Sequence, residues 1–214
     1  SRRHPFRQPF GAGGNPMERT APTPSAGTRF EVHPLTPERW RDFEELFGSH
    51  GAYGGCWCMW WRSTRREFEK RKGEGNRRAM QAIVDSGKVP GLLAYLGRTP
   101  VGWCSVAPRE EFSSLERSPV LKRLDDLPVW SMVCFYVAKR FRGQGIAEAL
   151  IGGALDYVRS CGGSWVEAYP TPPKETPLAP VSSFMGLPAM FIRAGFVECA
   201  RPSRGKLVMR CRLG

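Results

Sequence analysis

The clearest pattern of apolar and polar positions lies between residues 147 and 158. Six apolar residues recur there at i, i+3 and i+4 spacing: Ala147, Leu150, Ile151, Ala154, Leu155 and Val158. Charged residues occupy the opposite positions, and a pair of glycines follows at 162 and 163. This spacing predicts an amphipathic helix that packs one face on a hydrophobic core and ends at the glycine pair.

Short apolar runs bounded by glycine, proline or polar residues predict the strands. They cover residues 30–33, 91–96, 101–106, 129–137, 164–169, 196–200 and 207–212. Helical spacing predicts further helices at 37–47, in two pieces within 64–86 and at 188–194, with one or two short helices in the connector 108–127. This order mixes hairpins with β-α-β units, which predicts an α/β (α+β) fold with a sheet of mixed direction.

The patterning also suggests the domain organisation. Residues 1–29 are rich in Arg, Pro, Gly, Ser and Thr and have almost no apolar periodicity, so they are predicted to form a flexible basic tail. Residues 30–214 are predicted to form one globular domain. We find no run of the roughly 18 apolar residues that a membrane span needs and no apolar leader. We therefore expect a cytoplasmic protein without a membrane partner.

The net charge of +12 implies an anionic partner, such as nucleic acid, anionic lipid or a phosphorylated cofactor. Most of the excess lies in residues 1–29 and 193–214, a distribution more typical of a solubilising surface than of a binding groove. The seven cysteines are odd in number, and Cys104, Cys134 and Cys199 lie in apolar runs, which favours free thiols. The Cys56-x-Cys58 spacing and three scattered histidines predict no metal site.

A glycine motif connects the predicted strand 129–137 to the amphipathic helix. Its sequence is Ala-Lys-Arg-Phe-Arg-Gly-Gln-Gly-Ile-Ala, residues 138–147. Glycines at such a turn let consecutive backbone N–H groups converge at a helix N-terminus, an arrangement that binds pyrophosphate. No Lys follows at P-loop spacing, and Glu148 stands where a dinucleotide-binding motif needs glycine. A plain turn between strand and helix is the remaining alternative.

At this point the sequence resembles a known family. Arg140-x-x-Gly143-x-Gly145 matches the [QR]xxGx[GA] signature of the GNAT acetyltransferase superfamily. Residues 133–137 resemble its central strand, and residues 189–196, which end in Gly-Phe, resemble its second motif. The Cys-Trp-Cys-Met segment at 56–59 is similar to that of a little-characterised bacterial subgroup. The resemblance implies a GNAT-like, mostly antiparallel sheet flanked by helices, with the cofactor cradle between the central strand and the next helix.

The resemblance further implies an N-acetyltransferase that moves an acetyl group from acetyl-CoA to an amine by direct attack in a ternary complex. The acceptor would be a small-molecule or a protein amine, and no metal is required. A homodimer is compatible with this assignment. The N–H near Val137 would polarise the thioester carbonyl. The cofactor-binding residues implied are Phe135, Tyr136, Val137, Arg140, Arg142, Gly143, Gln144, Gly145, Ile146, Ala147 and Phe191.

The acid and the base are assigned by strand parity and chemistry. Glu167 lies on the strand beside the cofactor strand and is the predicted base, with Tyr169 on the same face as the predicted acid. Tyr136 is an alternative acid, because Phe191 stands where the family often has a Tyr; departure of the thiolate without an acid is another alternative. Water or a carboxylate from the loops is the alternative base: Glu110, Glu111 or Glu175.

Three features of the sequence allow more than one interpretation: the tryptophan run, Cys134 and the function of the whole chain. The aromatic run Trp57, Trp60 and Trp61 fits a hydrophobic core or a wall of the acceptor site. Cys134 is expected to be an inert buried thiol rather than a nucleophile. The chain is predicted to be an enzyme, with two alternatives. One is a GNAT-like acyl-CoA-binding module without catalysis. The other is a nucleic-acid-binding protein, for which the sequence contains no recognition signature.

Overall fold

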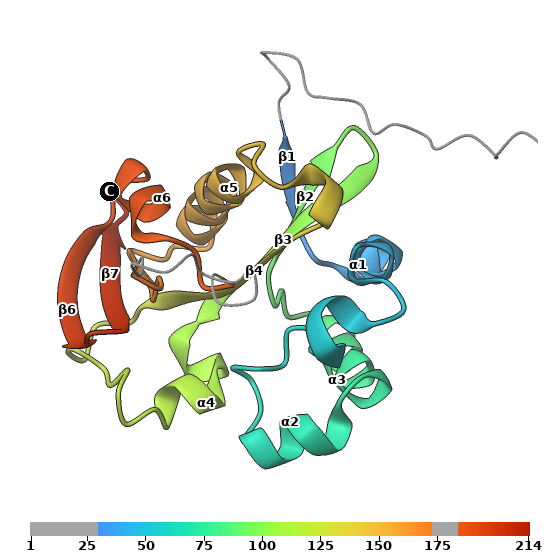
Figure 1. Ribbon diagram of the computed structural model, residues 1–214. Helices are drawn as coiled ribbons and strands as arrows, with labels where there is room; N and C mark the ends of the chain where they lie inside the picture. The colour runs from blue at the N-terminus through green and yellow to red at the C-terminus, as the bar shows by residue number, and fades with distance from the viewer. Residues whose placement is uncertain (1–29, 173–183) are drawn as a thin grey trace, which may run out of the picture.

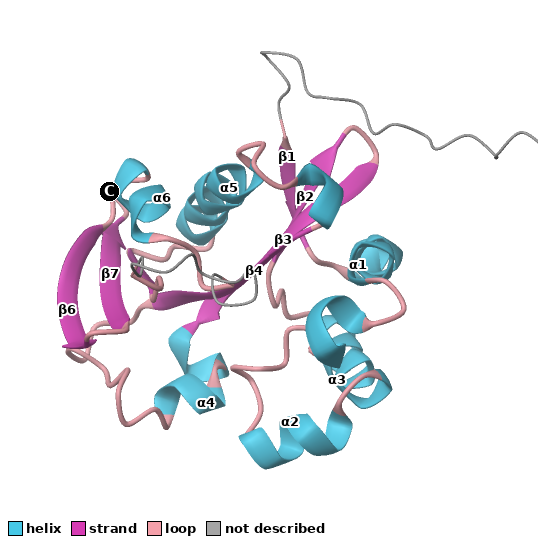
Figure 2. Ribbon diagram, in the orientation of Figure 1, coloured by secondary structure: helices cyan, strands magenta, loops and turns pink. Residues whose placement is uncertain are grey.

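A seven-stranded sheet in the order β1-β2-β3-β4-β5-β7-β6 forms the centre of the protein, which we describe from a computed structural model (Figures 1 and 2). The structure describes residues 30–172 and 184–214, so the predicted tail 1–29 and Glu175 lie outside it. Among the described strands, β4 and β5 alone pair in parallel, and the other neighbouring strands are antiparallel. This confirms the predicted mixed, mostly antiparallel sheet. The strands are β1 (Glu31–Pro34), β2 (Leu92–Leu96), β3 (Thr99–Pro108), β4 (Trp130–Val137), β5 (Trp165–Ala168), β6 (Val197–Ser203) and β7 (Lys206–Arg212).

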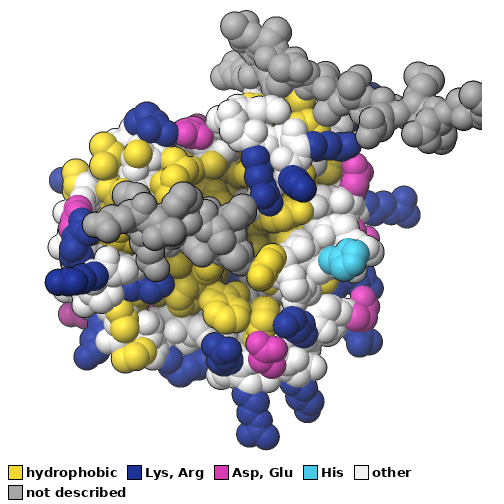
Figure 3. Space-filling view, in the orientation of Figure 1, with side chains coloured by type: hydrophobic (Ala, Val, Ile, Leu, Met, Phe, Trp, Pro, Cys, Tyr) yellow, Lys and Arg dark blue, Asp and Glu magenta, His cyan; other side chains and the backbone are white. Residues whose placement is uncertain are grey.

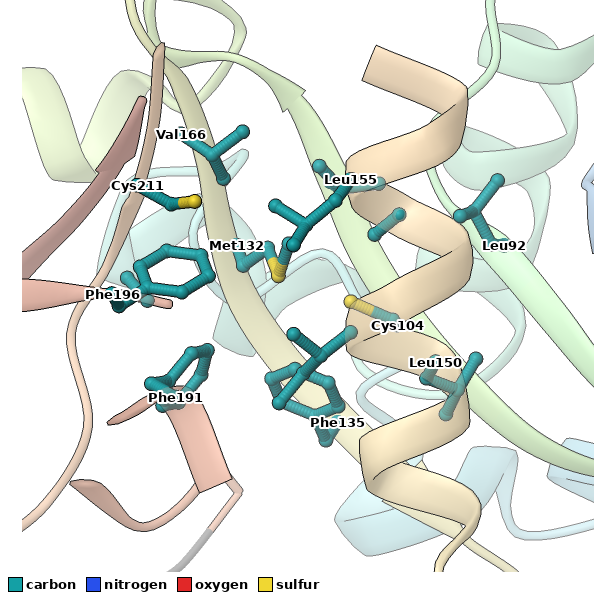
Figure 4. Close-up of a cluster of buried hydrophobic side chains, with 14 of the residues drawn as sticks. Leu92, Cys104, Met132, Phe135, Leu150, Leu155, Val166, Phe191, Phe196 and Cys211 are labelled. Carbon is teal, nitrogen blue, oxygen red and sulfur yellow. The ribbon is translucent and has the colours of Figure 1, made fainter. Parts of the chain in front are cut away.

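Helices cover both faces of the sheet. The helix α5 packs on one face, where Leu150 and Leu155 join a buried cluster with Met132 and Phe135 of β4 (Figure 4). The opposite face carries α1, α3 and α4, because alternate residues of each strand point to opposite sides. The helices are α1 (Trp40–Phe47), α2 (Arg65–Arg71), α3 (Glu74–Asp85), α4 (Ser113–Glu116), α5 (Ile146–Ser160) and α6 (Pro188–Arg193).

The strands β4 and β5 diverge after a short paired stretch. They pair from Trp130 with Val166 to Met132 with Ala168, and β4 then continues alone to Val137. A β-bulge at Val133 accompanies the separation, because Met132 faces Val106 whereas Cys134 faces Ser105. Bulges of this kind bend a strand and commonly adjoin functional sites. The opening between the two strands lies next to the start of α5.

Most predicted elements are present, and the differences are local. The two helical pieces within 64–86 are α2 and α3, separated at Gly73. The helix expected at 37–47 begins with a 3₁₀ turn (Pro37–Arg39), and Thr36 makes no side-chain cap. The strand expected at 196–200 extends to Ser203 as the edge strand β6, where Cys199 is exposed rather than buried. None of the helices described here has the length and apolar character to cross a membrane.

Candidate active site

The link between β4 and α5 forms an open cradle of backbone amides. A 3₁₀ turn, Lys139–Phe141, follows β4, and both glycines of the motif then adopt left-handed backbone angles, with φ of 76° at Gly143 and 82° at Gly145. A Cβ atom on either glycine would meet nothing within 4 Å. These positions therefore need glycine for their backbone conformation and for free access from outside, not for packing.

Positive charge surrounds the cradle. Lys139, Arg140 and Arg142 are exposed, and Arg142 is oriented by a 3.1 Å bond from its Nε to the Val137 carbonyl. Glu148, the acidic residue in the first turn of α5, is neutralised by Arg193 at 2.6 Å. Figure 3 shows Lys and Arg side chains at the rim of a central apolar area on this face of the molecule. A helix N-terminus surrounded by exposed cations suits a pyrophosphate group.

The cradle, the bulged β4 and the divergence of β4 from β5 occur together, and comparison with known families agrees. The model of the Acetyltransferase (GNAT) family matches residues 57–174, which is more than half of the chain. The chain belongs to the GNAT acetyltransferase family. No curated protein matches this sequence.

Solved GNAT structures with TM-scores above 0.5 show the same fold. An acetyltransferase of the family from Listeria monocytogenes 4b F2365 has a TM-score of 0.53 and 14% identity, over 89% of this chain and 99% of that one. A second, from Streptococcus agalactiae 2603, has a TM-score of 0.51 and 15% identity, over 86% of this chain and 96% of that one. The PaiA N-acetyltransferase from Thermoplasma acidophilum, in complex with coenzyme A, has 12% identity and a TM-score of 0.48, over 86% and 99% of the chains.

The backbone predicted to hold the pantetheine arm faces the opening between β4 and β5. The Phe135 N–H donates to the Phe184 carbonyl at 2.6 Å, and the Thr171 N–H donates to the Gly186 carbonyl at 3.1 Å. Residues 184–186 therefore link β4 to the chain that follows β5. The Val137 N–H points to the same edge as that of Phe135, because alternate residues of a strand direct their amides alike. Residues 184–186 thus occupy the Phe135 amide, one of the two backbone amides, Phe135 and Val137, on this edge of β4.

Phe191 lies beneath this segment. Its side chain is fully buried, and its ring packs edge-on against Phe135 at 6.0 Å and Phe196 at 5.2 Å between ring centroids (Figure 4). A Cβ on Gly186 would come within 2.7 Å of the Phe191 ring. Contact between Phe191 and a cofactor stays a prediction, and it requires residues 184–186 to move.

Glu167 and Tyr169 lie together in a buried polar network. Glu167 is 1% exposed, and its Oε2 accepts from Arg109 at 3.0 Å and from the Tyr169 hydroxyl at 2.6 Å. Its Oε1 accepts from Arg210 at 2.7 Å. Ser131 of β4 bonds to the same hydroxyl at 2.8 Å. Strand parity predicted that Glu167 and Tyr169 share a face, and the structure shows that they do.

The two arginines of this network were not identified from the sequence. Arg109 follows β3 directly, and Arg210 lies within the buried strand β7. A lone arginine at an inward position of an apolar strand needs a buried acidic partner. The alternation of β7 therefore contained a signal for Arg210. The sequence did not identify Glu167 as the partner of Arg210, because the two residues are 43 positions apart in the chain.

The contacts favour a structural role for this pair. Burial, and then the charge of Glu167, raise the pKa of Tyr169 well above its ordinary value, which makes the hydroxyl a weaker proton donor. Both oxygens of Glu167 already accept hydrogen bonds. The catalytic roles of Glu167 and Tyr169 stay predictions. Tyr136, the alternative acid, is half-buried on β4 and packs on Phe47 at 5.5 Å.

The loop carboxylates and the tryptophans occupy distinct places. Glu111 is paired with Arg62 at 3.0 Å, whereas Glu110 is exposed.

Trp57 is buried, which fits the core interpretation, and Trp60 is 38% exposed. Trp61 packs against the same apolar cluster as Cys134 and Phe184, and its buried Nε1 has no hydrogen-bond partner among the described residues. Trp61 and Cys134 of β4 thus pack on the same side of the sheet.

A metal centre is not apparent in residues 30–172 and 184–214. Those residues contain no group of three or more His, Cys, Asp or Glu side chains arranged to hold an ion.

Proposed function

We propose that this protein is an N-acetyltransferase that uses acetyl-CoA as acyl donor and an amine as acceptor. The observation that carries the proposal is the cradle of left-handed Gly143 and Gly145 at the N-terminus of α5, with exposed cations around it. Its shape and charge suit the pyrophosphate of CoA. Acetyl-CoA would supply an acetyl thioester, a carbonyl open to attack by an amine.

The chain's own residues have three tasks in this proposal. The amides of residues 142–147 bind the pyrophosphate, and Lys139, Arg140 and Arg142 add charge-assisted bonds. The Val137 N–H, at the open edge of β4, donates to the thioester oxygen, where charge develops during attack. A preorganised donor at such a position contributes about 3 kcal/mol of transition-state stabilisation where it has been measured.

Proton transfer is the least constrained part of the proposal. Glu167 stays our candidate base, and Tyr169 and Tyr136 are the candidate acids. Of the two tyrosines, Tyr136 has the more favourable position, because it is half-buried at the end of β4 whereas Tyr169 is 1% exposed. The CoA thiolate can also depart without an acid, because its conjugate thiol has a pKa of about 8.5.

The decisive experiment measures release of free CoA from acetyl-CoA in the presence of a panel of small amines and peptides. Turnover that depends on an acceptor, and that is lost in Gly145→Val, would support the proposal. CoA binding without turnover on any acceptor would instead favour a non-catalytic acyl-CoA-binding module. The buried Phe191 and the fully engaged Glu167 are the observations that favour this second candidate.

A further inference from the structure

Three thiols form a row between the loop after α1 and the cofactor strand. The Sγ of Cys58 donates to the Sγ of Cys134 on β4 at 3.3 Å, and Cys56 precedes Cys58 by two residues in the same loop. Cys56 and Cys134 are each partly exposed, whereas Cys58 between them is 4% exposed. Nothing in acetyl transfer by direct attack uses these groups.

The backbone of this loop is held in an unfavourable conformation. Trp57 and Cys58 are consecutive non-glycine residues with left-handed angles, φ of 36° and 51°. Side chains rarely adopt such angles, and they persist where surrounding packing enforces them, often at functional sites. Here the Trp57 ring stacks on Phe47 at 5.7 Å, and it fills the space where a Cβ on Gly51 would lie. The packing of Trp57 thereby directs Cys58 toward β4.

The chemistry of the row is asymmetric. The neighbouring Cys58 side chain, together with backbone contacts, lowers the pKa of Cys56 to about 7. Burial raises the pKa of Cys58. The thiolate is the reactive form of cysteine, so at neutral pH the accessible Cys56 is the first thiol to react and Cys58 stays protonated until a neighbour is oxidised.

We propose that Cys56, Cys58 and Cys134 form a peroxide-reactive site whose product is a disulfide between Cys58 and Cys134. In the first step the Cys56 thiolate attacks hydrogen peroxide, forms a sulfenic acid and releases hydroxide. The Cys58 sulfur then attacks the Cys56 sulfur, its proton joins the departing hydroxide as water, and a Cys56–Cys58 disulfide forms. In the third step Cys134 gives its proton to the hydroxide released in the first step, forming the second water, and its sulfur attacks Cys58 and displaces Cys56 as a thiolate. The sum converts two thiols and one peroxide into one disulfide and two waters.

Geometry supports the last exchange. A disulfide bond is about 2.05 Å long, so the two sulfurs need to approach by only about 1.2 Å. Cys56 is a good leaving group because its thiolate is stabilised. The product joins the loop before α2 to β4, on the strand that the proposed function assigns to the cofactor.

The test maps disulfides in a variant without the exposed thiols, Cys161→Ser with Cys199→Ser. The folded protein is treated with stoichiometric hydrogen peroxide, free thiols are alkylated in denaturant, and peptides are identified by mass spectrometry. We expect a Cys58–Cys134 linkage that dithiothreitol reverses. Cys104, fully buried on β3 with its side chain in the α5-side cluster, is the internal control and stays reduced.

Two further variants test the order of steps. Cys56→Ser should slow formation of the linkage by at least tenfold, and Cys134→Ser should accumulate the Cys56–Cys58 disulfide. Full alkylation of Cys58 and Cys134 after treatment, or oxidation of Cys56 to sulfinic acid without any linkage, would overturn the proposal. Because no acetyl-CoA is used, this outcome is independent of the proposed function.

Discussion

At the scale of single residues, the two glycines of the cradle carry the most specific expectation. Gly143→Val and Gly145→Val should each weaken CoA binding by tenfold or more, about 1.4 kcal/mol. A β-branched side chain disfavours the left-handed backbone and enters the space that the pyrophosphate would use. Calorimetric titration with CoA measures the effect. Gly152→Val is the matched control, since Gly152 is an exposed position of α5 where a Cβ meets nothing within 4 Å.

Glu167 allows its structural and catalytic roles to be separated. Glu167→Gln should lower the free energy of unfolding by about 3 kcal/mol, because it leaves Arg109 and Arg210 without a buried charge partner. Chemical denaturation measures this loss. Glu198→Gln, which removes a carboxylate from an exposed pair with Arg201, should cost less than about 0.5 kcal/mol.

The pH profile of the same variant decides the catalytic role. If Glu167 is the base, Glu167→Gln should reduce the acetylation rate by about 10² and abolish the acidic limb of the profile. If a folded Gln variant kept the parental rate across pH, Glu167 would only orient Arg109 and Tyr169. The general base would then be water or a loop carboxylate.

Asp125 should contribute to the acid sensitivity of the fold. The hydrogen bond from Arg210, at 2.5 Å, lowers the pKa of Asp125 below its ordinary value. A carboxylate with a lowered pKa in the folded state stabilises the fold above its unfolded pKa, and the contribution disappears as pH falls through the folded pKa. Asp125→Asn should therefore flatten the decline of stability below about pH 4. Asp126→Asn, at a neighbouring carboxylate without an ion pair among the described residues, should leave the decline unchanged.

At the scale of elements, residues 184–186 occupy the edge of β4 that a pantetheine arm would need. Gly186 has a φ of 82°, and a Cβ there would collide with Phe191. Gly186→Ala should loosen the segment and raise the affinity for CoA by about two- to fivefold, because a competing internal contact is weakened. Adenosine 3′,5′-bisphosphate, which lacks the pantetheine arm, is the control ligand and should bind both proteins equally. An equal change for both ligands would place the effect in the phosphate cradle instead.

The elements also show what sequence reasoning reaches. The helix α5 and the glycine turn were predictable, because their signals are local: a 3.6-residue period and glycines at a strand–helix junction. The position of residues 184–186 beside β4 was not predictable. It depends on a hydrogen bond from the Phe135 N–H to the carbonyl of Phe184, 49 residues later, and such a backbone contact has no local sequence signal. The same holds for the Cys58–Cys134 contact across 76 residues. Side-chain networks that join distant segments depend on the sheet order, which the local pattern does not contain.

At the scale of the whole molecule, the question is whether the net charge of +12 or the position of particular charges governs binding. Summed charge raises the encounter rate with any anion, whereas cations beside the cradle stabilise the bound pyrophosphate. Two double variants separate these effects. Arg140→Gln with Arg142→Gln removes two cations at the cradle, and Arg201→Gln with Arg204→Gln removes two at the far β6–β7 hairpin. Each lowers the net charge equally, from +12 to +10.

The cradle pair should weaken CoA binding by about tenfold and reduce its dependence on ionic strength, since exposed charges are screened over about 10 Å at 0.1 M salt. The hairpin pair should change CoA affinity by less than about twofold, because β6 is the edge strand, three positions from β4 in the sheet, which is about 14 Å at the usual strand spacing. Titrations at two salt concentrations measure both effects. A duplex oligonucleotide serves as the competing polyanion. If both double variants weakened CoA and oligonucleotide binding equally, the charge would act as a general polyanion-binding surface, and the pyrophosphate assignment of the cradle would be wrong.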